Sequence, residues 1–297
     1  MRAMATRAFS RAAALACLLA LGPLAGGCGG DGGGGDRAKR PTRSASRPIA
    51  KRPPAAAPAF RPLAVPADAP RHSVRVPILM YHRVHELATE LTRSQPELTV
   101  EPAEFRRQMR ALLRAGYRTI TQRQLFDAVY RAAALPRRPV IVSVDDGYVD
   151  DVTEILPVLR RLRMVATFYV ITGRTHEAGF LSARQIRSLE RAGMDVGAHT
   201  RTHPDLPSLA AEGLRAEVSG SARDLRRILG HPVYWFAYPA GAFDERTIGA
   251  VRRAGFLMAV TTQPGSSVSS TAPFAIPRLR VNRSTGVRGV LDLVRDG

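Results

Sequence analysis

Apolar and polar residues alternate along most of this chain in a way that predicts strands and helices in turn. Short apolar or β-branched runs, such as Val76–Tyr81 and Val140–Val142, have the composition of buried parallel strands. Between such runs, apolar residues recur at helical spacing, as Phe105 and Met109 do in the segment 101–115. This order of elements predicts βαβ crossovers, and therefore a parallel sheet with helices outside it.

The predicted elements extend from about residue 74 to residue 297. Strands are predicted over 76–81, 117–120, 140–144, 166–171, 195–199, 233–238, 256–262 and 276–281. Helices are predicted over 101–115, 121–130, 152–163, 182–193, 210–229, 244–254 and 284–295, with Thr121, Ser182 and Asp244 as N-caps and Gly230 as a stop. Seven to eight strand–helix repeats in a domain of about 220 residues favour an α/β barrel over an open sheet.

Polar residues with metal-binding chemistry follow two of the predicted strands. One strand breaks at Asp145-Asp146-Gly147, and a later strand ends in the H-x-x-x-H pattern of His199 and His203. Two adjacent carboxylates repel each other, and the arrangement becomes favourable where one ligates a cation and the other acts as a base. One carboxylate and two histidines leave positions on a metal ion open for water and substrate. Because the carboxyl ends of barrel strands share one mouth, we expect these side chains to converge.

These motifs resemble those of the polysaccharide deacetylases, the NodB-homology group of carbohydrate esterase family 4. The family's first motif, T-F-D-D-G, is matched by SVDDG at 143–147, and its second, H-x-x-x-H, is matched at 199–203. Further similar segments are VPILMYHRV at 76–84, ATFYVI at 166–171, FAYPAGAFDE at 236–245 and IPRLRV at 276–281. The resemblance covers about residues 74–297, and the MYH and FAYPxG blocks are most similar to the branch that acts on exported poly-N-acetylglucosamine.

The resemblance implies a distorted (β/α) barrel and a hydrolase that removes N-acetyl groups. It implies that Asp146, His199 and His203 hold a divalent transition metal, with zinc expected and cobalt, nickel or iron as alternatives. It also implies that Asp145 is the general base. In the third family motif, R-x-P-Y-G, a backbone N–H stabilises the oxyanion, and the N–H of Ala240 holds that place here.

The chain departs from the family pattern at two places. Ala237 stands where the family has the arginine that orients the base, and Arg278 or Arg280 in the last strand is a candidate to replace it. The family's last motif, L-x-H, supplies a histidine as general acid, yet no histidine follows His231. His82, at the end of the first strand, is our hypothesis for that acid, and the alternative is a structural hydrogen bond at the barrel rim.

Together these observations predict metal-dependent deacetylation of an extracytoplasmic polysaccharide by a monomeric protein. Poly-N-acetylglucosamine, peptidoglycan and chitin-like polymers are candidate substrates, and O-acetyl esters of a plant polymer are another. The altered third motif and the missing last motif leave open a glycan-binding lipoprotein that keeps the barrel without turnover. Acetate release from N-acetylglucosamine oligomers separates these two functions.

Residues 1–27 have the composition of a signal peptide. A positive N-terminal part precedes AAALACLLALGPLAGG, an apolar stretch too short for a good membrane span. LAGGC at 24–28 resembles a bacterial lipobox, which predicts that Cys28 is lipidated and anchors an exported protein to a membrane of the cell envelope. A secreted form or an uncleaved anchor is the alternative. Cys17 and Cys28 are the only cysteines, so the mature domain is expected to be stable without an intramolecular disulfide.

Residues 28–73 are predicted to be a disordered tether that precedes the catalytic domain at 74–297. Glycine and then arginine, proline, alanine and serine dominate there, and this composition cannot bury enough surface to offset the entropy of ordering it. Its basic residues predict either contact with anionic envelope components or a solvated spacer. The net charge of the whole chain is +19, yet no zinc-finger, helix-turn-helix or aromatic stacking pattern accompanies it, so no nucleic-acid partner is predicted.

Overall fold

The computed structural model describes residues 62–90 and 96–297. The predicted signal peptide, Cys28 and most of the predicted tether lie outside these residues. Within them, no helix has the length and apolar character that crossing a membrane requires.

The described residues form short strands in alternation with helices, as the sequence predicts. The strands are β1 (Ser73–Arg75), β2 (Ile78–Tyr81), β3 (Arg83–Val84), β4 (Thr99–Val100), β5 (Arg118–Thr119), β6 (Pro139–Val144), β7 (Thr167–Val170), β8 (Asp195–Ala198), β9 (Trp235–Ala237), β10 (Met258–Val260), β11 (Ser267–Ser269) and β12 (Leu279–Arg280). The α-helices are α1 (Leu87–Glu90), α2 (Pro102–Arg114), α3 (Gln122–Arg131), α4 (Leu156–Leu162), α5 (Ala183–Arg191), α6 (Ala211–Leu229), α7 (Glu245–Arg253) and α8 (Gly286–Asp296).

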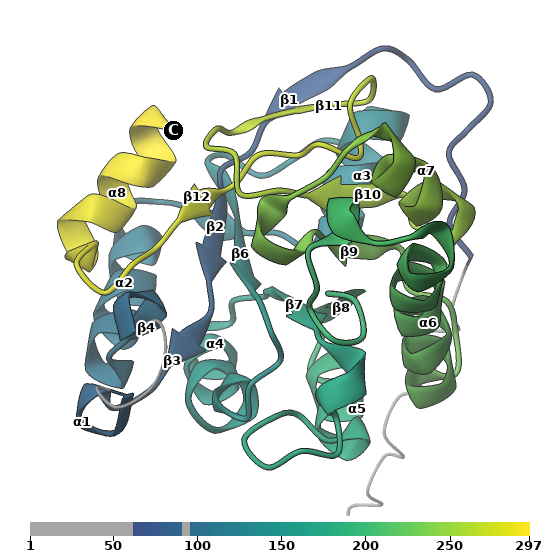
Figure 1. Cartoon of the computed structure of the whole chain (residues 1–297). Helices are drawn as coiled ribbons and strands as arrows, with labels where there is room; N and C mark the ends of the chain where they lie inside the picture. The colour runs from purple at the N-terminus through teal and green to yellow at the C-terminus, as the bar shows by residue number, and fades with distance from the viewer. Residues whose placement is uncertain (1–61, 91–95) are drawn as a thin grey trace, which may run out of the picture. The chain divides into compact units, whose positions relative to one another are not determined.

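The central sheet is parallel and curled, in the order β10-β9-β8-β7-β6-β2-β12, with β5 added on β6 (Figure 1). Ile276 bridges Val260 of β10, and four residues later Arg280 pairs with Met80 of β2. One short segment therefore spans from one side of the curled sheet to the other. The α/β class and the distorted barrel predicted from the sequence are confirmed.

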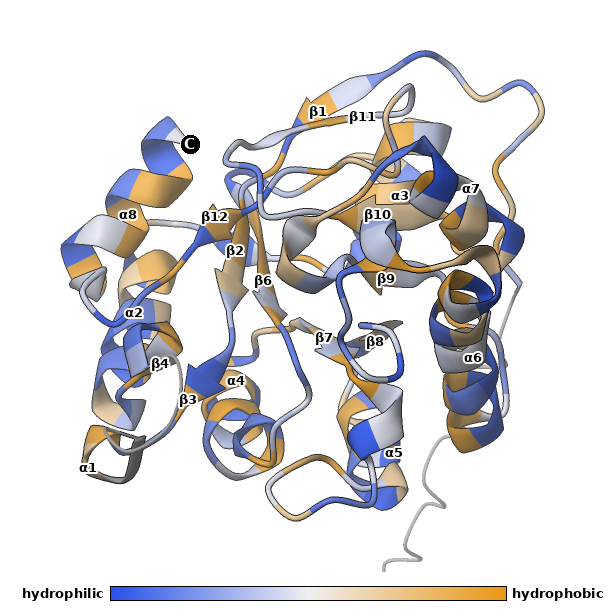
Figure 2. Cartoon of the chain, in the orientation of Figure 1, coloured by the Kyte–Doolittle hydropathy of each residue, from blue (hydrophilic) through white to orange (hydrophobic). Residues whose placement is uncertain are grey.

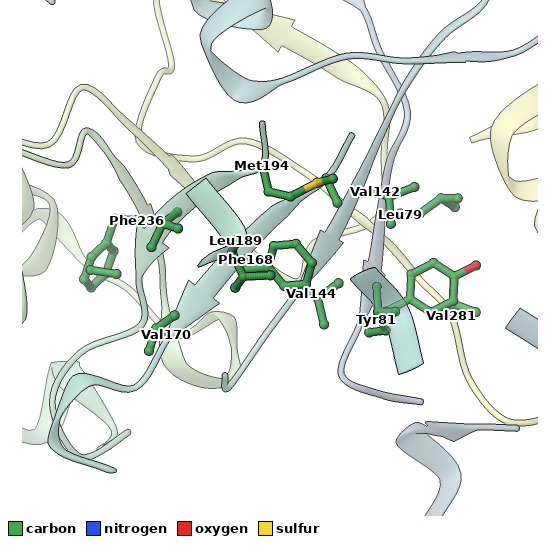
Figure 3. Packing of buried hydrophobic residues seen from close by; sticks show 14 of the residues in the cluster. Leu79, Tyr81, Val142, Val144, Phe168, Val170, Leu189, Met194, Phe236 and Val281 are labelled. Carbon is green, nitrogen blue, oxygen red and sulfur yellow. The ribbon is translucent and has the colours of Figure 1, made fainter. Parts of the chain in front are cut away.

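The two faces of the sheet bury different residues, because successive side chains of a strand point to opposite sides. Leu79, Val142 and Phe168 belong to the apolar layer between strands and helices, and Figure 3 shows them among the buried side chains of this layer. Ile78 and Ile141, one position away, belong to a second cluster on the inner face. Figure 2 shows the same division as apolar strands inside and polar outer helix surfaces. Each fully buried aliphatic or aromatic side chain contributes about 1.5–3 kcal/mol.

Helix α3 closes the amino end of the barrel. Its Leu125 and Phe126 join the inner cluster, and the Phe126 ring lies 6.2 Å from the Trp235 ring at the start of β9. Thr121 caps α3 with a reciprocal capping box. Capping boxes also form at Ser182 and Asp244, as the sequence predicts, and such caps contribute about 0.5–2 kcal/mol each.

The predicted helix 152–163 is less regular than expected. It begins as a π-helical turn over Asp151–Ile155, in which the N–H of Leu156 bonds to the carbonyl of Asp151, before α4 continues. Pro157 explains the change, because proline has no N–H to give to the carbonyl four residues back.

Short paired strands outside the central sheet were not predicted. Strand β1 pairs with β11 in antiparallel fashion, and β3 pairs with β4. The described end of the predicted tether, from residue 62, lies against the domain. Leu63 is only 7% exposed, and its N–H donates to the Tyr234 hydroxyl at 3.0 Å. Further along, the N–H of His72 donates to the Ser270 hydroxyl at 2.9 Å, so both apolar and polar contacts hold this part of the chain.

Candidate active site

All six residues predicted to form the site line one cavity at the carboxyl end of the barrel. The cavity has a volume of about 410 Å³. The six residues are His82 after β2, Asp145 and Asp146 after β6, His199 and His203 after β8, and Ala240 after β9. The structure therefore brings these six residues together at one mouth.

Asp145 and His199 are each the first residue after a strand, and the backbone hydrogen bonds of the parallel sheet still hold them. The N–H of Asp145 still bonds to the carbonyl of Tyr81 at 3.0 Å, and the N–H of His199 bonds to that of Val170 at 2.9 Å. Both side chains therefore point to the inner face, at the level where the strands end.

Directly after Asp145 the backbone turns sharply. Asp146 has a φ of 79° and Gly147 has a φ of 75°. A Cβ on Gly147 would lie 3.0 Å from Cγ1 of Val170. Glycine therefore satisfies both the left-handed conformation and the close approach to β7, and this turn brings Asp146 back over the barrel mouth.

Three potential ligand atoms lie close together at this mouth. Oδ1 of Asp146 lies 3.5 Å from Nε2 of His199 and 3.9 Å from Nε2 of His203. All three ligand atoms lie within 4.8 Å of one another. A zinc ion sits about 2.0–2.2 Å from each nitrogen or oxygen ligand, so only a small adjustment would place all three atoms around one ion.

The hydrogen bond of the His199 side chain leaves its Nε2 available as a metal ligand. Its Nδ1 lies 2.8 Å from the carbonyl oxygen of Ala237. Since a carbonyl only accepts, Nδ1 carries the proton and Nε2 keeps its lone pair toward Asp146. Burial lowers the pKa of His199 to about 3 and also lowers the pKa of His203. Both imidazoles are therefore neutral at physiological pH, which is the form that binds metal.

The loop that carries His203 holds an unusual backbone conformation. Thr200 and His203 have φ values of 63° and 64°. The Thr200 hydroxyl donates to the carbonyl of His199 at 2.6 Å and accepts the N–H of His203 at 3.0 Å. A non-glycine residue in this region costs about 1–3 kcal/mol, so the hydrogen bonds of Thr200 stabilise a strained turn that brings the second histidine beside the first.

Asp145 is held by a buried arginine. Nη1 and Nη2 of Arg278 donate to the two carboxylate oxygens at 2.7 Å each, and Nε of Arg278 donates to the carbonyl of Thr261 at 2.9 Å. Arg278 is 1% exposed. Of the two arginines that the sequence left open, Arg278 therefore orients Asp145, while Arg280 lies at the cavity rim.

The two neighbouring carboxylates have opposite electrostatic environments. Burial by itself would raise the pKa of Asp145, but the Arg278 guanidinium outweighs it and holds the pKa below its usual range. Burial and the charge of Asp145 raise the pKa of Asp146 to about 7. Asp145 is thus ionised and suited to accept a proton, whereas Asp146 gains most from a cation that replaces its proton.

His82, the predicted general acid, and Ala240, the predicted oxyanion donor, both line the cavity. Burial lowers the pKa of His82 to about 4, and its Nδ1 is buried without a hydrogen-bond partner among the described residues. Ala240 has a φ of 52° inside a short helical turn at the cavity wall. Their chemical roles remain predictions.

Other side chains of the cavity wall were missed by sequence reasoning, among them Arg83, Tyr148 and Arg174. Arg83 donates to both oxygens of the buried Asp150 at 2.8 and 3.0 Å and lies 4.4 Å from the Tyr148 ring centre. Their position in the sequence could have indicated that Arg83 and Tyr148 lie near the site, because Arg83 directly follows His82 and Tyr148 directly follows the D-D-G turn.

A parallel barrel with one carboxylate, two neutral histidines and an ionised carboxylate at its mouth is the arrangement found in hydrolases that activate water with a metal ion. The comparisons specify the class further. A family model described as polysaccharide deacetylase matches residues 132–259. The protein YxkH of Bacillus subtilis (strain 168) is 28% identical over 215 residues, which are 72% of this chain and 74% of YxkH.

Solved structures agree with the family match. The Streptococcus pyogenes deacetylase PplD, in complex with acetate, has a TM-score of 0.70 and 26% identity over 75% of this chain and 99% of PplD. A polysaccharide deacetylase from Bacillus cereus, BC0361, has a TM-score of 0.65 and 28% identity over 75% of this chain and 69% of its own. These matches identify a polysaccharide deacetylase domain of the NodB-like type of carbohydrate esterase in this chain, and this class consists of hydrolases that act on amide bonds.

Proposed function

We propose that this protein is a metal-dependent deacetylase that removes N-acetyl groups from an extracytoplasmic polysaccharide. The observation that carries the proposal is the convergence of Asp146, His199 and His203 within 4.8 Å, beside an Asp145 that Arg278 holds ionised. Deacetylases of this family are metal-dependent, and the neutral histidines and the carboxylate form a donor set that suits zinc, with cobalt, nickel or iron as alternatives.

When bound, the metal ion supplies Lewis acidity, which polarises the acetyl carbonyl and acidifies a water molecule. The chain's own residues move the protons. Asp145 accepts the proton of the attacking water, and Arg278 keeps that carboxylate ionised and oriented. The N–H of Ala240 faces the negative charge that develops on the acetyl oxygen.

His82 is our proposed general acid for the leaving amine. Because burial lowers its pKa to about 4, His82 starts the reaction neutral and must receive the proton that it passes on. The charge of Asp145 raises the pKa of His82, and Asp145 is the neighbour that takes up a proton from water. Transfer from Asp145 to His82 and then to the amine conserves the proton within the cavity.

The location and substrate are proposed from the sequence. The signal peptide, the lipidated Cys28 and the basic tether would place the domain at a bacterial membrane, facing polysaccharides of the envelope. Poly-N-acetylglucosamine, peptidoglycan and chitin-like polymers all present the N-acetyl group that the site would hydrolyse. The altered third motif was one of two reasons to consider a glycan-binding protein without turnover. Arg278 weakens that reason, because it supplies the guanidinium that is missing at Ala237.

Acetate release tests the proposal. The metal-loaded protein is incubated with N-acetylglucosamine oligomers, peptidoglycan glycan strands and chitin oligomers, and acetate is measured enzymatically. Asp145→Asn is expected to reduce release at least about 10³-fold, because it removes the base, while metal content is retained. Asp205→Asn is the matched control, since Asp205 is exposed, lies in the loop after His203 and does not line the cavity. Wild-type protein that releases no acetate from any polymer would refute the activity.

A further inference from the structure

The cavity is also lined by Arg280, which lies two residues after Arg278, the arginine that binds the carboxylate of the base Asp145. Arg278 directly precedes β12, and successive residues of this extended segment alternate between faces, so Arg278 and Arg280 share the inner face while Leu279, 3% exposed, faces the helices. Arg278 lies below the mouth and is fully engaged by Asp145. Arg280 stands one layer higher, exposed to solvent, and lines the cavity close to His82.

The other two arginines of the cavity wall already have acidic partners. Arg83 pairs with Asp150 at 2.8 Å. Arg174 pairs with Glu177 at 2.8 Å and lies 3.7 Å from the centre of the Phe180 ring. Within residues 62–90 and 96–297, no carboxylate forms an ion pair with Arg280.

The two carboxylates of the cavity do not neutralise the charge of Arg280 either, because each has other partners. Asp145 is neutralised by Arg278, and Asp146 lies between the two histidines. The rim beside the reacting groups therefore presents a guanidinium whose donors are available to a bound ligand. A guanidinium fits a carboxylate by two parallel hydrogen bonds, and a charge-assisted pair of this kind is about twice as strong as a neutral one.

We propose that Arg280 binds a carboxylate on the substrate, so that the enzyme selects an anionic N-acetylated glycan over a neutral one. This inference depends on the proposed deacetylase function and specifies its substrate class. The carboxylate can come from a lactyl ether on the acetylated sugar, as in peptidoglycan strands, or from a neighbouring uronic acid. A neutral poly-N-acetylglucosamine chain offers no partner for the charge, and a deacetylated, cationic product is repelled by it.

The test compares kcat/KM for acetate release on three oligomers of equal length. One is neutral N-acetylglucosamine, one carries lactyl carboxylates, and one alternates N-acetylglucosamine with uronic acid. Wild-type protein is expected to prefer one of the carboxylate-bearing oligomers, and the preferred one identifies the source of the carboxylate. Arg280→Gln is expected to reduce this preference about 10- to 100-fold, because a charge-assisted hydrogen bond is lost.

Arg288→Gln serves as the matched control, since Arg288 is exposed on α8 and does not line the cavity. This change removes the same charge and is expected to leave the preference unaltered. The preference of the wild-type protein should also weaken as ionic strength rises.

Three outcomes would overturn the inference. Equal losses on the neutral and anionic oligomers would show that Arg280 acts on the reacting acetyl group. An unchanged preference in Arg280→Gln would show that Arg280 is a solvated rim charge. Wild-type protein that favours the neutral oligomer would contradict the selectivity directly.

A binding measurement keeps the inference separate from the proposed activity. Calorimetric titration of the Asp145→Asn protein with the same three oligomers requires no turnover. Affinity for the preferred anionic oligomer is expected to fall about 10-fold or more when Arg280→Gln is added. If the affinity depends neither on the carboxylate of the oligomer nor on Arg280, the inference is overturned even where acetate release is confirmed. If binding is selective but no acetate is released, only the catalytic function is overturned.

Discussion

The two ends of strand β8 each carry an ionisable group, and the groups are held in different ways. At the amino end, Asp195 accepts the backbone N–H of Arg123 at 3.1 Å, in the first turn of α3. The aromatic rings of Trp235 and Phe126 pack nearby. At the carboxyl end, His199 lies 3.5 Å from Asp146, whose backbone is in the left-handed region.

The difference separates a structural use of polar groups from a chemical one. At the amino end, the partner of the carboxylate is a backbone N–H at a helix N-terminus, which joins β8 to α3. At the mouth, strained backbone and opposed pKa values persist because they hold groups ready for a ligand. Changes at the mouth should therefore affect catalysis most, and changes at the amino end should affect stability alone.

The largest combined effect on stability and catalysis is expected for Arg278→Met. It leaves the carboxylate of Asp145 buried without its cation, which costs about 3–5 kcal/mol of unfolding free energy at pH 7. Acetate release should fall at least about 10²-fold, because burial then raises the pKa of the base. Denaturant unfolding and acetate assays measure the two losses.

The pH dependence of the same pair has a defined sign. The pKa of Asp145 is held below its unfolded value, so the stabilisation is complete above about pH 4 and is lost as pH falls through the folded pKa. Arg278→Met should lack this acid-side loss. Arg280→Met is the control, since its exposed side chain should change unfolding free energy by less than about 0.5 kcal/mol. Equal stability of the two variants would contradict the importance of the buried pair.

His82→Ala is expected to have an intermediate effect. Turnover should decrease about 10²-fold, the usual contribution of a general acid, while metal content stays unchanged. Metal analysis and initial rates on the same preparations check both points. Wild-type turnover would assign His82 the structural role that the sequence left open.

Asp195→Asn is expected to have the smallest effect, and on stability only. Burial raises the pKa of Asp195 to about 6, so ionising it costs free energy in the folded protein, and stability declines as pH rises from about 4 to 6. The amide oxygen still accepts the N–H of Arg123, so the variant should be about 1–2 kcal/mol more stable than wild type at pH 8 and similar at pH 4. Unfolding curves at the two pH values test this, and a loss of turnover would place Asp195 among the functional groups.

The sequence predicted the regular parts of the molecule well, because local rules govern them. Apolar runs marked the central strands, and Thr121, Ser182 and Asp244 marked helix starts through capping. The D-D-G turn and the H-x-x-x-H pattern indicated the site because strand ends in a parallel barrel share one mouth.

Other features depend on tertiary register, which the sequence does not specify. Arg278, directly before β12, and Arg280, at its end, lie on the same face, and only the pairing of β12 with β2 decides which of them reaches Asp145. The strands β1 and β11 are three residues each and largely polar, so they have no periodic signal of their own.

The most direct test of the central claim is the metal stoichiometry of the purified protein after reconstitution with zinc. The site geometry predicts one ion per chain in the wild type, and loss of that ion on His199→Ala, His203→Ala or Asp146→Asn, with Asp145→Asn retaining it. Full metal content in all three ligand variants, or none in the wild type, would contradict the claim that Asp146, His199 and His203 hold one ion beside Asp145.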